Sequence, residues 1–249
     1  MQRSRRILIL LLTFMLLAGL TVGERLWVRS AMHPLDVAVY PVAMDAESAA
    51  YIRQLTAADF QEIPSFLATE AQRWKRQPAY PPRIVLHAPI GEWPPMNPVH
   101  SRWDAISLSL RLRWYAFRHT PFWGSLGKVR MFVLYHPLQF DLSLPHSLGL
   151  QKGLLGVAHV FASDQQRAQN NVVIAHELLH TLGATDKYDE NGQPVYPKGF
   201  AEPYADPRYP QQRAEIMAGR IPISPTRAEI PRGLNEVEIG YATASEIGW

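Results

Sequence analysis

The sequence predicts a single α+β domain that follows a short N-terminal membrane segment. Three observations indicate this fold class. Short apolar runs typical of strands alternate with longer segments of helical periodicity between residues 35 and 182. A loop-rich stretch and one more helical segment follow. The 249 residues are enough for one sizeable core, and they contain no internal repeat. We therefore expect residues 31–249 to form one domain.

The composition excludes several function classes. At 47% hydrophobic and 19% charged residues the chain is that of an ordinary globular protein. It has no cysteine, which excludes disulfides, thiolate metal sites and a catalytic thiol. The net charge of +3 is local, because residues 1–30 hold five arginines and one glutamate, and the remainder carries −1. A nearly neutral domain gives no electrostatic reason to expect nucleic acid as a partner.

Residues 1–30 are typical of a signal-anchor, or of a signal peptide with a linker. Arg3, Arg5 and Arg6 precede an uncharged apolar run, Ile7–Val22. This run is longer than a usual signal core and the best cleavage site, Thr21-Val22-Gly23, is poor, so we favour an uncleaved anchor over a cleaved signal. A buried helix of the domain would leave the basic flank unexplained. Because positive residues stay in the cytoplasm, we expect a single-pass protein of the cell membrane whose domain is periplasmic or extracellular.

The first part of the domain is predicted to form a strand, a helical segment and a second strand. Leu35–Ala43 is an apolar strand, and Pro41 within it favours an edge position because proline cannot donate to a sheet. Residues 46–76 have helical periodicity with a break or kink expected at Pro64. Arg83–Ala88 is a second short strand, followed by a proline-rich loop.

Residues 105–117 fit two patterns. Their apolar side chains alternate as in a strand, yet Ile106, Leu110, Trp114 and Phe117 also share one face of a helix. Leucine and arginine favour helix, so we predict a helix here.

The centre of the chain predicts two strands and a helix. Val129–Tyr135 and Gly156–Ala162 are the strands. The apolar stretch VVIAHELLHTLG that follows predicts a helix with Asn170 or Asn171 as its N-cap.

The C-terminal part begins with a loop-rich region, residues 187–232, which is rich in proline, glycine, tyrosine and aspartate. A last helix is expected to start near Asn235. Val237, Tyr241 and Ala244, spaced i, i+4 and i+7, would form its buried stripe.

The sequence HELLH within the predicted central helix contains candidate metal-binding and catalytic residues. His176 and His180 stand at i and i+4 on one helix face, so both imidazoles can reach one metal ion. Glu177 adjoins the first ligand and can act as general base on a metal-bound water without binding the metal itself. The bare motif also arises by chance in unrelated sequences, so the residues after it decide its meaning.

Those residues supply a turn and a third ligand. Gly183 can end the helix in a sharp turn, and Asp186, three residues later, can return a carboxylate to the same ion. Two imidazoles and one carboxylate with an open fourth position are typical of catalytic zinc. The alternative is an ordinary histidine pair with a glycine cap and a surface aspartate.

HELLHTLGATD resembles the metzincin signature His-Glu-x-x-His-x-x-Gly-x-x-His, with aspartate at the last position as in snapalysin-type metallopeptidases. The segment EIMAG (215–219) is similar to the Met-turn of that family. The resemblance implies a zincin-like domain with a small mixed sheet, an active-site helix and a C-terminal helix. It implies His176, His180 and Asp186 as zinc ligands, Glu177 as base and Met217 as a non-ligating floor. Gly156–Ala162 would be the edge strand that binds an extended peptide.

The resemblance has departures and leaves alternatives. Some metzincins place a tyrosine two residues after the methionine, where this chain has Gly219. Glu202 or Glu215 could replace Asp186 as third ligand, as in other zincins. Tyr188 and Tyr204 are either oxyanion donors or ordinary loop tyrosines, and we expect His159 to be structural.

The leading functional hypothesis is a membrane-anchored, exported zinc metallopeptidase that hydrolyses protein or peptide substrates through a zinc-bound water with Glu177 as general base. A non-catalytic, zinc-stabilised peptide-binding module and a zinc hydrolase of a non-peptide amide are the alternatives. Zn²⁺ is the expected cofactor, although two histidines and a carboxylate also suit other divalent ions. These residues leave the cleavage specificity and the oligomeric state open.

Overall fold

The computed structural model describes residues 35–76, 82–94, 101–120, 128–138, 148–150 and 154–249, with residues 5–9, 11, 12, 15, 19, 22 and 23 near the N-terminus. These N-terminal residues are helical and exposed. The rest of the predicted signal-anchor, including the boundary between residues 30 and 31, lies outside the described residues, as does the end of the proline-rich loop. Within the described part of the chain, no helix is both long and apolar enough to cross a membrane.

The domain is built on a five-stranded mixed sheet with the order β2-β1-β3-β5-β4. The first four strands are parallel and β4 runs antiparallel to β5. Because helices connect most of the parallel strands, the architecture is α/β rather than α+β. The strands are β1 (Asp36–Ala43), β2 (Arg83–Leu86), β3 (Val129–His136), β4 (Leu148–Leu150) and β5 (Leu155–Phe161).

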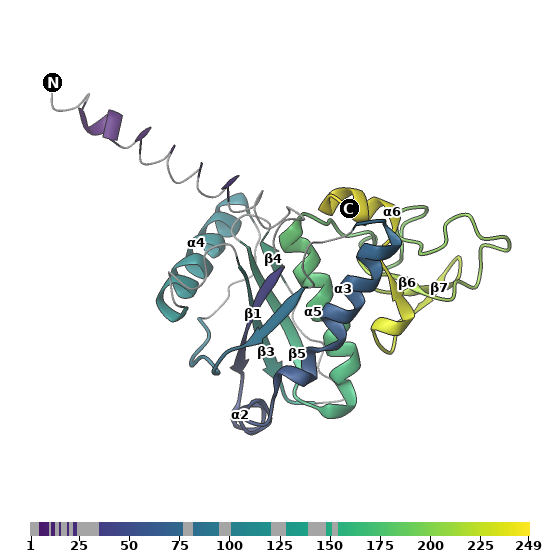
Figure 1. Cartoon of the computed structure of the whole chain (residues 1–249), viewed down its shortest axis with the longest axis horizontal. Helices are drawn as coiled ribbons and strands as arrows, with labels where there is room; N and C mark the ends of the chain where they lie inside the picture. The colour runs from purple at the N-terminus through teal and green to yellow at the C-terminus, as the bar shows by residue number, and fades with distance from the viewer. Residues whose placement is uncertain are drawn as a thin grey trace.

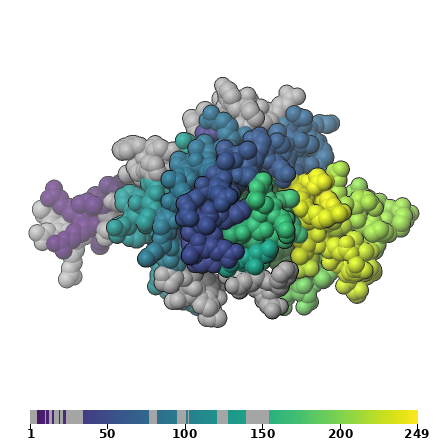
Figure 2. All heavy atoms as spheres, turned by 90° about the horizontal axis from the view of Figure 1, so that it is seen from below, coloured from purple at the N-terminus to yellow at the C-terminus, as the bar shows by residue number. Residues whose placement is uncertain are grey.

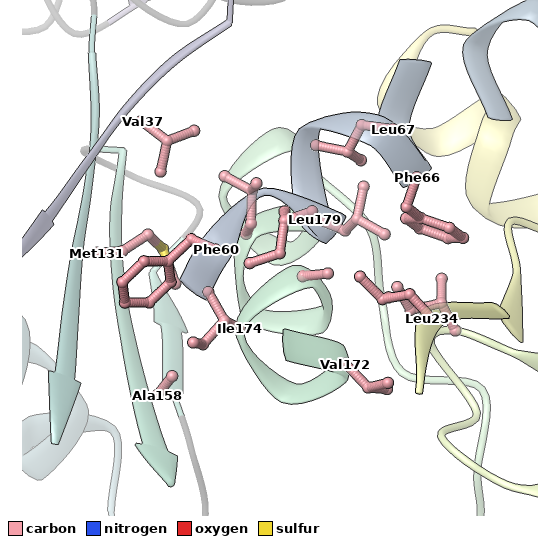
Figure 3. Packing of buried hydrophobic residues seen from close by; sticks show 14 of the residues in the cluster. Val37, Phe60, Phe66, Leu67, Met131, Ala158, Val172, Ile174, Leu179 and Leu234 are labelled. Carbon is pink, nitrogen blue, oxygen red and sulfur yellow. The ribbon is translucent and has the colours of Figure 1, made fainter. Parts of the chain in front are cut away.

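Helices cover both faces of this sheet (Figure 1). On one face lie α3 (Glu62–Arg73) and α5 (Arg167–Leu182), and on the other lies α4 (Arg102–His119). In Figure 3, Val37, Met131 and Ala158 of the sheet face Phe60 and the α5 residues Ile174 and Leu179. Alternate residues of β1 enter the two cores, as the period of two in a strand requires.

The C-terminal third lies beside α5 and α3 (Figure 1). It holds two small two-stranded sheets and the last helix. Its elements are β6 (Ala214–Glu215) paired with β9 (Val237–Glu238), β7 (Ile221–Ser224) paired with β8 (Arg227–Glu229), the 3-10 turn η3 (Leu234–Glu236) and α6 (Tyr241–Ile247).

Two helical predictions are confirmed. Residues 46–76 form α2 (Ala46–Ile52), the 3-10 turn η1 (Ala57–Phe60) and α3. The break predicted at Pro64 lies upstream of it, between α2 and α3, and Pro64 lies in the first turn of α3, where its missing N–H costs nothing. The ambiguous segment 105–117 lies within α4.

The prediction that Pro41 marks an edge strand is wrong, because β1 lies between β2 and β3. The Pro41 carbonyl accepts a hydrogen bond from the Ile90 amide, 2.9 Å away, on the β2 side. The missing N–H therefore points to that same side, where β2 has already ended at Leu86. No hydrogen bond to β3 is lost.

The prediction that Gly156–Ala162 is an edge strand is also wrong. β5 lies between β3 and β4, and β4 pairs with Leu155, Gly156 and Val157. β4 is only three residues long and follows no sequence pattern that separates it from a loop.

Two helix starts differ from prediction. α5 begins at Arg167, upstream of both predicted caps, and the Asn170 side chain instead bonds the backbone N and O of Phe161. Asn171 donates to the Asp59 carbonyl. The last helix begins only at Tyr241, because Val237 and Glu238, just upstream, pair with β6. The prediction that Tyr241 belongs to a buried stripe is wrong, since its side chain is exposed.

Candidate metal centre

α5 places the two histidines of HELLH side by side. The imidazole centroids of His176 and His180 are 4.7 Å apart with their planes at 81°. Burial of Ile174, Leu178 and Leu179 against the sheet and α3 fixes the rotation of the helix and leaves both imidazoles on its partly open side. The sequence prediction of one shared helix face is confirmed.

The helix ends at Gly183, as predicted. Its φ of 115° lies in the left-handed region, which a side chain would disfavour. The amides of Gly183 and Ala184 bond the carbonyls of His180 and Leu179, both at 3.1 Å. This turn sends the chain back along the helix toward the histidines.

Asp186 reaches both histidines from that returning segment. Its Oδ1 lies 3.2 Å from His176 Nε2 and 3.1 Å from His180 Nε2. In the described part of the chain, this is the one group of three or more His, Asp or Glu residues with the spacing of metal ligands, and the three ligand atoms lie within 4.8 Å of one another. Glu202, which is exposed, and Glu215 are not part of it.

Backbone carbonyls orient both imidazoles. His176 Nδ1 lies 2.9 Å from the Ile216 carbonyl, and His180 Nδ1 lies 2.9 Å from the Ala184 carbonyl. A carbonyl only accepts, so each Nδ1 carries the proton and each Nε2 is the atom that faces Asp186. Histidines that bind metal ions in proteins have the same arrangement, in which the ring nitrogen that does not bind the metal donates its N–H to a backbone carbonyl or a carboxylate.

Burial and the neighbouring charges shift the pKa values of His176 and Asp186 in opposite directions. Burial alone would lower the pKa of His176, but the Asp186 hydrogen bond and the Glu177 charge outweigh burial and raise it. Burial favours a higher pKa for Asp186, but the hydrogen bonds of both histidines hold that pKa well below its usual range. Two neutral Nε2 atoms that face a carboxylate oxygen at these distances repel it, and a shared proton or a bound cation would relieve that repulsion. The donor set fits a divalent metal such as zinc.

Glu177 is a buried carboxylate beside the three ligands. Its side chain is about 5% exposed, its Oε1 is 4.0 Å from His176 Nε2, and its Oε2 has no hydrogen-bond partner among the described residues. Burial raises its pKa, against the opposing effect of the two histidines. An unsatisfied buried carboxylate oxygen is rare and marks a group held ready to accept a proton or a ligand.

The predicted Met-turn packs against this centre. Glu215 is fully buried and accepts four hydrogen bonds, from Met217 N (2.7 Å) and Ala218 N (3.1 Å) within the turn and from Gly240 N (3.1 Å) and Thr243 Oγ1 (2.6 Å) of the last segment. The Glu215 carboxylate therefore stabilises the turn. Each of its oxygens accepts two hydrogen bonds, so neither is available to bind a metal ion.

The same turn touches both sides of the metal centre through its backbone. The Ile216 carbonyl holds His176, and the Met217 carbonyl accepts the amide of Lys187, the residue after Asp186, at 2.9 Å. The Met217 side chain is fully buried in the core with Ala175 and Leu178. Gly219 follows at a φ of 68°.

A polar network holds the segment that carries Asp186. Lys187 Nζ, buried, donates to Glu246 Oε2 of α6 at 2.7 Å and to the Thr185 carbonyl at 2.6 Å. The Glu246 carboxylate also accepts from the Thr185 amide and hydroxyl, at 2.8 and 2.9 Å. The residues on both sides of Asp186 are thus tied to the C-terminal helix. The sequence shows no motif for this network, because 59 residues separate Lys187 from Glu246.

The two tyrosines considered from sequence differ in position. Burial, together with the charge of the nearby Asp186 carboxylate, raises the pKa of Tyr188 to about 12. Tyr204 is 84% exposed and lines a different surface hollow with Tyr196 and Tyr209. Tyr188 is thus the one that adjoins the metal centre.

A pocket of about 360 Å³ opens beside His176 and Glu177. Apolar side chains form most of its wall, with glutamine and asparagine at one end. His159 also lines it, and its Nδ1 is 2.8 Å from His136 Nε2, so it packs as a structural residue and borders the site as well. The apolar lining consists of Phe161, Val172, Val173, Ile216, Ile230 and Pro231. Ile230 and Pro231 belong to the loop-rich region, and no pattern in the sequence predicted that they would line a pocket.

The sequence matches no protein-family model, and a comparison with curated proteins found no match.

Proposed function

We propose that this chain is a zinc-dependent metallopeptidase of metzincin-like architecture. One observation carries the proposal: His176 Nε2, His180 Nε2 and Asp186 Oδ1 converge on one point, next to a buried carboxylate, Glu177, that has an unsatisfied oxygen. A structural metal site would be closed by a fourth protein ligand, whereas the described residues offer three. The mixed sheet and the turn at Glu215–Gly219 support the comparison with metzincins.

Zinc, when bound, would act as a Lewis acid on the scissile carbonyl and lower the pKa of water. Glu177, whose Oε1 lies 4.0 Å from His176 Nε2, would accept a proton from the attacking water and deliver it to the leaving amine nitrogen. Its burial favours this role, because a raised pKa makes a carboxylate a better proton carrier near neutral pH. The Ile216 and Ala184 carbonyls would keep both imidazoles in the metal-binding tautomer.

The pocket beside Glu177 would hold a substrate side chain next to the scissile bond. Its apolar wall favours an uncharged aliphatic or aromatic side chain, since a charged one would lose its hydration there. From sequence we also propose that the N-terminal segment anchors the protein in the cell membrane, with the domain on the outer side.

The test is peptide hydrolysis by the zinc-loaded full chain and by two matched variants. Glu177→Gln should retain zinc and lose roughly 10²-fold or more in kcat/KM, because it removes only the base. Glu190→Gln, an exposed glutamate in the nearby loop, should hydrolyse peptides like the parent. Normal turnover by Glu177→Gln would remove Glu177 from the mechanism. A zinc-loaded parent that binds peptides without cleaving them would favour the non-catalytic module instead.

A further inference from the structure

Helix α4 has an apolar face on each side. Leu112, Tyr115 and Ala116 are buried against Phe132 and other residues of the sheet. The opposite face is also apolar but open to solvent. Its members, with their exposed fractions, are Trp103 (79%), Ile106 (49%), Leu110 (63%), Trp114 (60%) and Phe117 (55%).

These five residues form one continuous stripe, here called the α4 outer stripe. Their spacing of three, four, four and three residues follows the helical repeat, so they stand above one another along the helix. The rings of Trp114 and Phe117 stack with centroids 5.8 Å apart. A soluble domain has no reason to align five large apolar side chains on its outer surface.

Arginines flank the α4 outer stripe. Arg111 and Arg118, both exposed, follow Leu110 and Phe117 directly and stand along one side of the stripe, and Arg113 precedes Trp114 on the other side. Residues 102–119 hold four arginines and one aspartate. Apolar residues with tryptophan, bordered by basic side chains, are the pattern of a helix that lies in the plane of an anionic membrane surface.

We propose that the α4 outer stripe rests in the headgroup region of an anionic lipid bilayer. Charge favours lipid over a second copy of the chain, because pairing two stripes would bring two rows of arginine together, whereas anionic headgroups attract them. The proposal does not depend on peptidase activity.

The arrangement of the chain agrees with this orientation. In Figures 1 and 2 the described N-terminal residues, in purple, extend from the end of the molecule where α4 lies, shown in teal. The described part of the predicted signal-anchor therefore lies at the α4 end of the molecule. Helix α5, which carries the metal-centre histidines, covers the opposite face of the sheet.

The absence of cysteine gives a direct test on the full chain. Leu110→Cys, labelled with an environment-sensitive fluorophore, probes the stripe. Gln72→Cys, an exposed position on α3 at the opposite face of the sheet, is the matched control. Both are reconstituted in phosphatidylcholine vesicles with about one third phosphatidylglycerol, and quenching by spin-labelled lipid and by aqueous iodide is measured.

The proposal predicts that lipid quenching is roughly threefold or more stronger at residue 110 than at residue 72, with the reverse order for iodide. Arg111→Gln with Arg118→Gln should weaken lipid quenching at residue 110. Ile106→Cys, on the same stripe, repeats the measurement if Leu110→Cys does not fold. Equal iodide access at both sites would overturn the proposal. So would a residue 110 that is shielded from iodide but not quenched by lipid, because a protein then covers the stripe.

Discussion

Gly183 adopts a backbone conformation that determines where the third ligand lies. With φ at 115°, it turns the chain so that Asp186 meets the histidines. We predict that Gly183→Ala lowers the free energy of unfolding by about 1–2 kcal/mol, because a side chain is strained in this region. It should also weaken zinc binding, since the turn would relax and move Asp186. Urea unfolding and competition with a zinc chelator measure the two effects.

Gly91→Ala is the control for that substitution, because a Cβ at Gly91 meets nothing within 4 Å and its φ is ordinary. If Gly183→Ala behaved like Gly91→Ala in both measurements, the turn would have no role in placing the ligand.

Glu246 should stabilise the fold in a pH-dependent way. Burial alone would raise its pKa, but the hydrogen bonds from Lys187 and Thr185 outweigh burial and hold the pKa below its usual range. Because the folded pKa lies below the unfolded one, the stabilisation is complete above the unfolded pKa and is lost as the pH falls through the folded pKa.

Glu246→Gln should therefore lower the free energy of unfolding by about 1–2 kcal/mol at pH 7 and by clearly less near pH 3. Urea unfolding at both pH values checks this, with Glu190→Gln as an exposed control. A difference between parent and variant that did not change with pH would show that the Glu246 charge contributes nothing.

At the scale of elements, the turn at Glu215–Gly219 joins α5 to the C-terminal segment. Glu215 is fully buried and its carboxylate accepts from four donors. Glu215→Gln would place an amide NH₂ against backbone N–H groups, and we predict a loss of about 2–4 kcal/mol in the free energy of unfolding. Zinc affinity should fall as well, because the Ile216 carbonyl that holds His176 belongs to this turn.

Thermal unfolding and chelator competition test this, with Glu229→Gln, an exposed glutamate on β8, as control. Unchanged zinc affinity in a folded Glu215→Gln protein would separate the turn from the metal centre.

The central helix and its ligands could be predicted from sequence because their signal is local. His176, His180, Gly183 and Asp186 follow one another at spacings that helix geometry makes meaningful. The central strands could be predicted for the same reason. A long apolar run such as Val129–Tyr135 indicates a buried strand without knowledge of the strands that pair with it.

The errors arose where a distant segment decides the structure. Pro41 occupies a central strand because β2 ends before it. Asn170 bonds β5 rather than capping α5. Val237 and Glu238 pair with β6 instead of continuing into a helix. The carbonyls that orient the imidazoles carry no side-chain signature, so the sequence could not indicate them.

For the whole molecule, the metal ion is expected to act as a cross-link. It would join α5 to the segment after Gly183, which Lys187 and Glu246 tie to α6. We predict that a chelator lowers the melting temperature of the zinc-loaded protein by about 8–16 °C, as expected for removing a ligand held at roughly 1,000 times its Kd. Differential scanning calorimetry measures the shift. Asp186→Ala should show little or no shift, and a parent that is equally insensitive would mean that no metal supports the fold.

The two proposed functions lie on opposite faces of the sheet, with lipid contact on the α4 face and the metal centre on the α5 face. α4, with its outer stripe of apolar residues, covers the side of the sheet opposite to α5 and its histidines. A bilayer in contact with α4 would therefore leave the α5 face of the sheet turned away from the lipid.

The zinc content of the purified chain decides whether His176, His180 and Asp186 form a metal centre. The purified full chain is compared with Asp186→Ala and with Asp164→Ala, a control aspartate whose side chain is 74% exposed. We predict one zinc per chain in the parent and in Asp164→Ala, and markedly less in Asp186→Ala. Full zinc loading of Asp186→Ala would place the third ligand elsewhere. A folded parent that binds no metal would contradict the proposed metal centre, because His176 and His180 would then be an ordinary histidine pair on a buried helix.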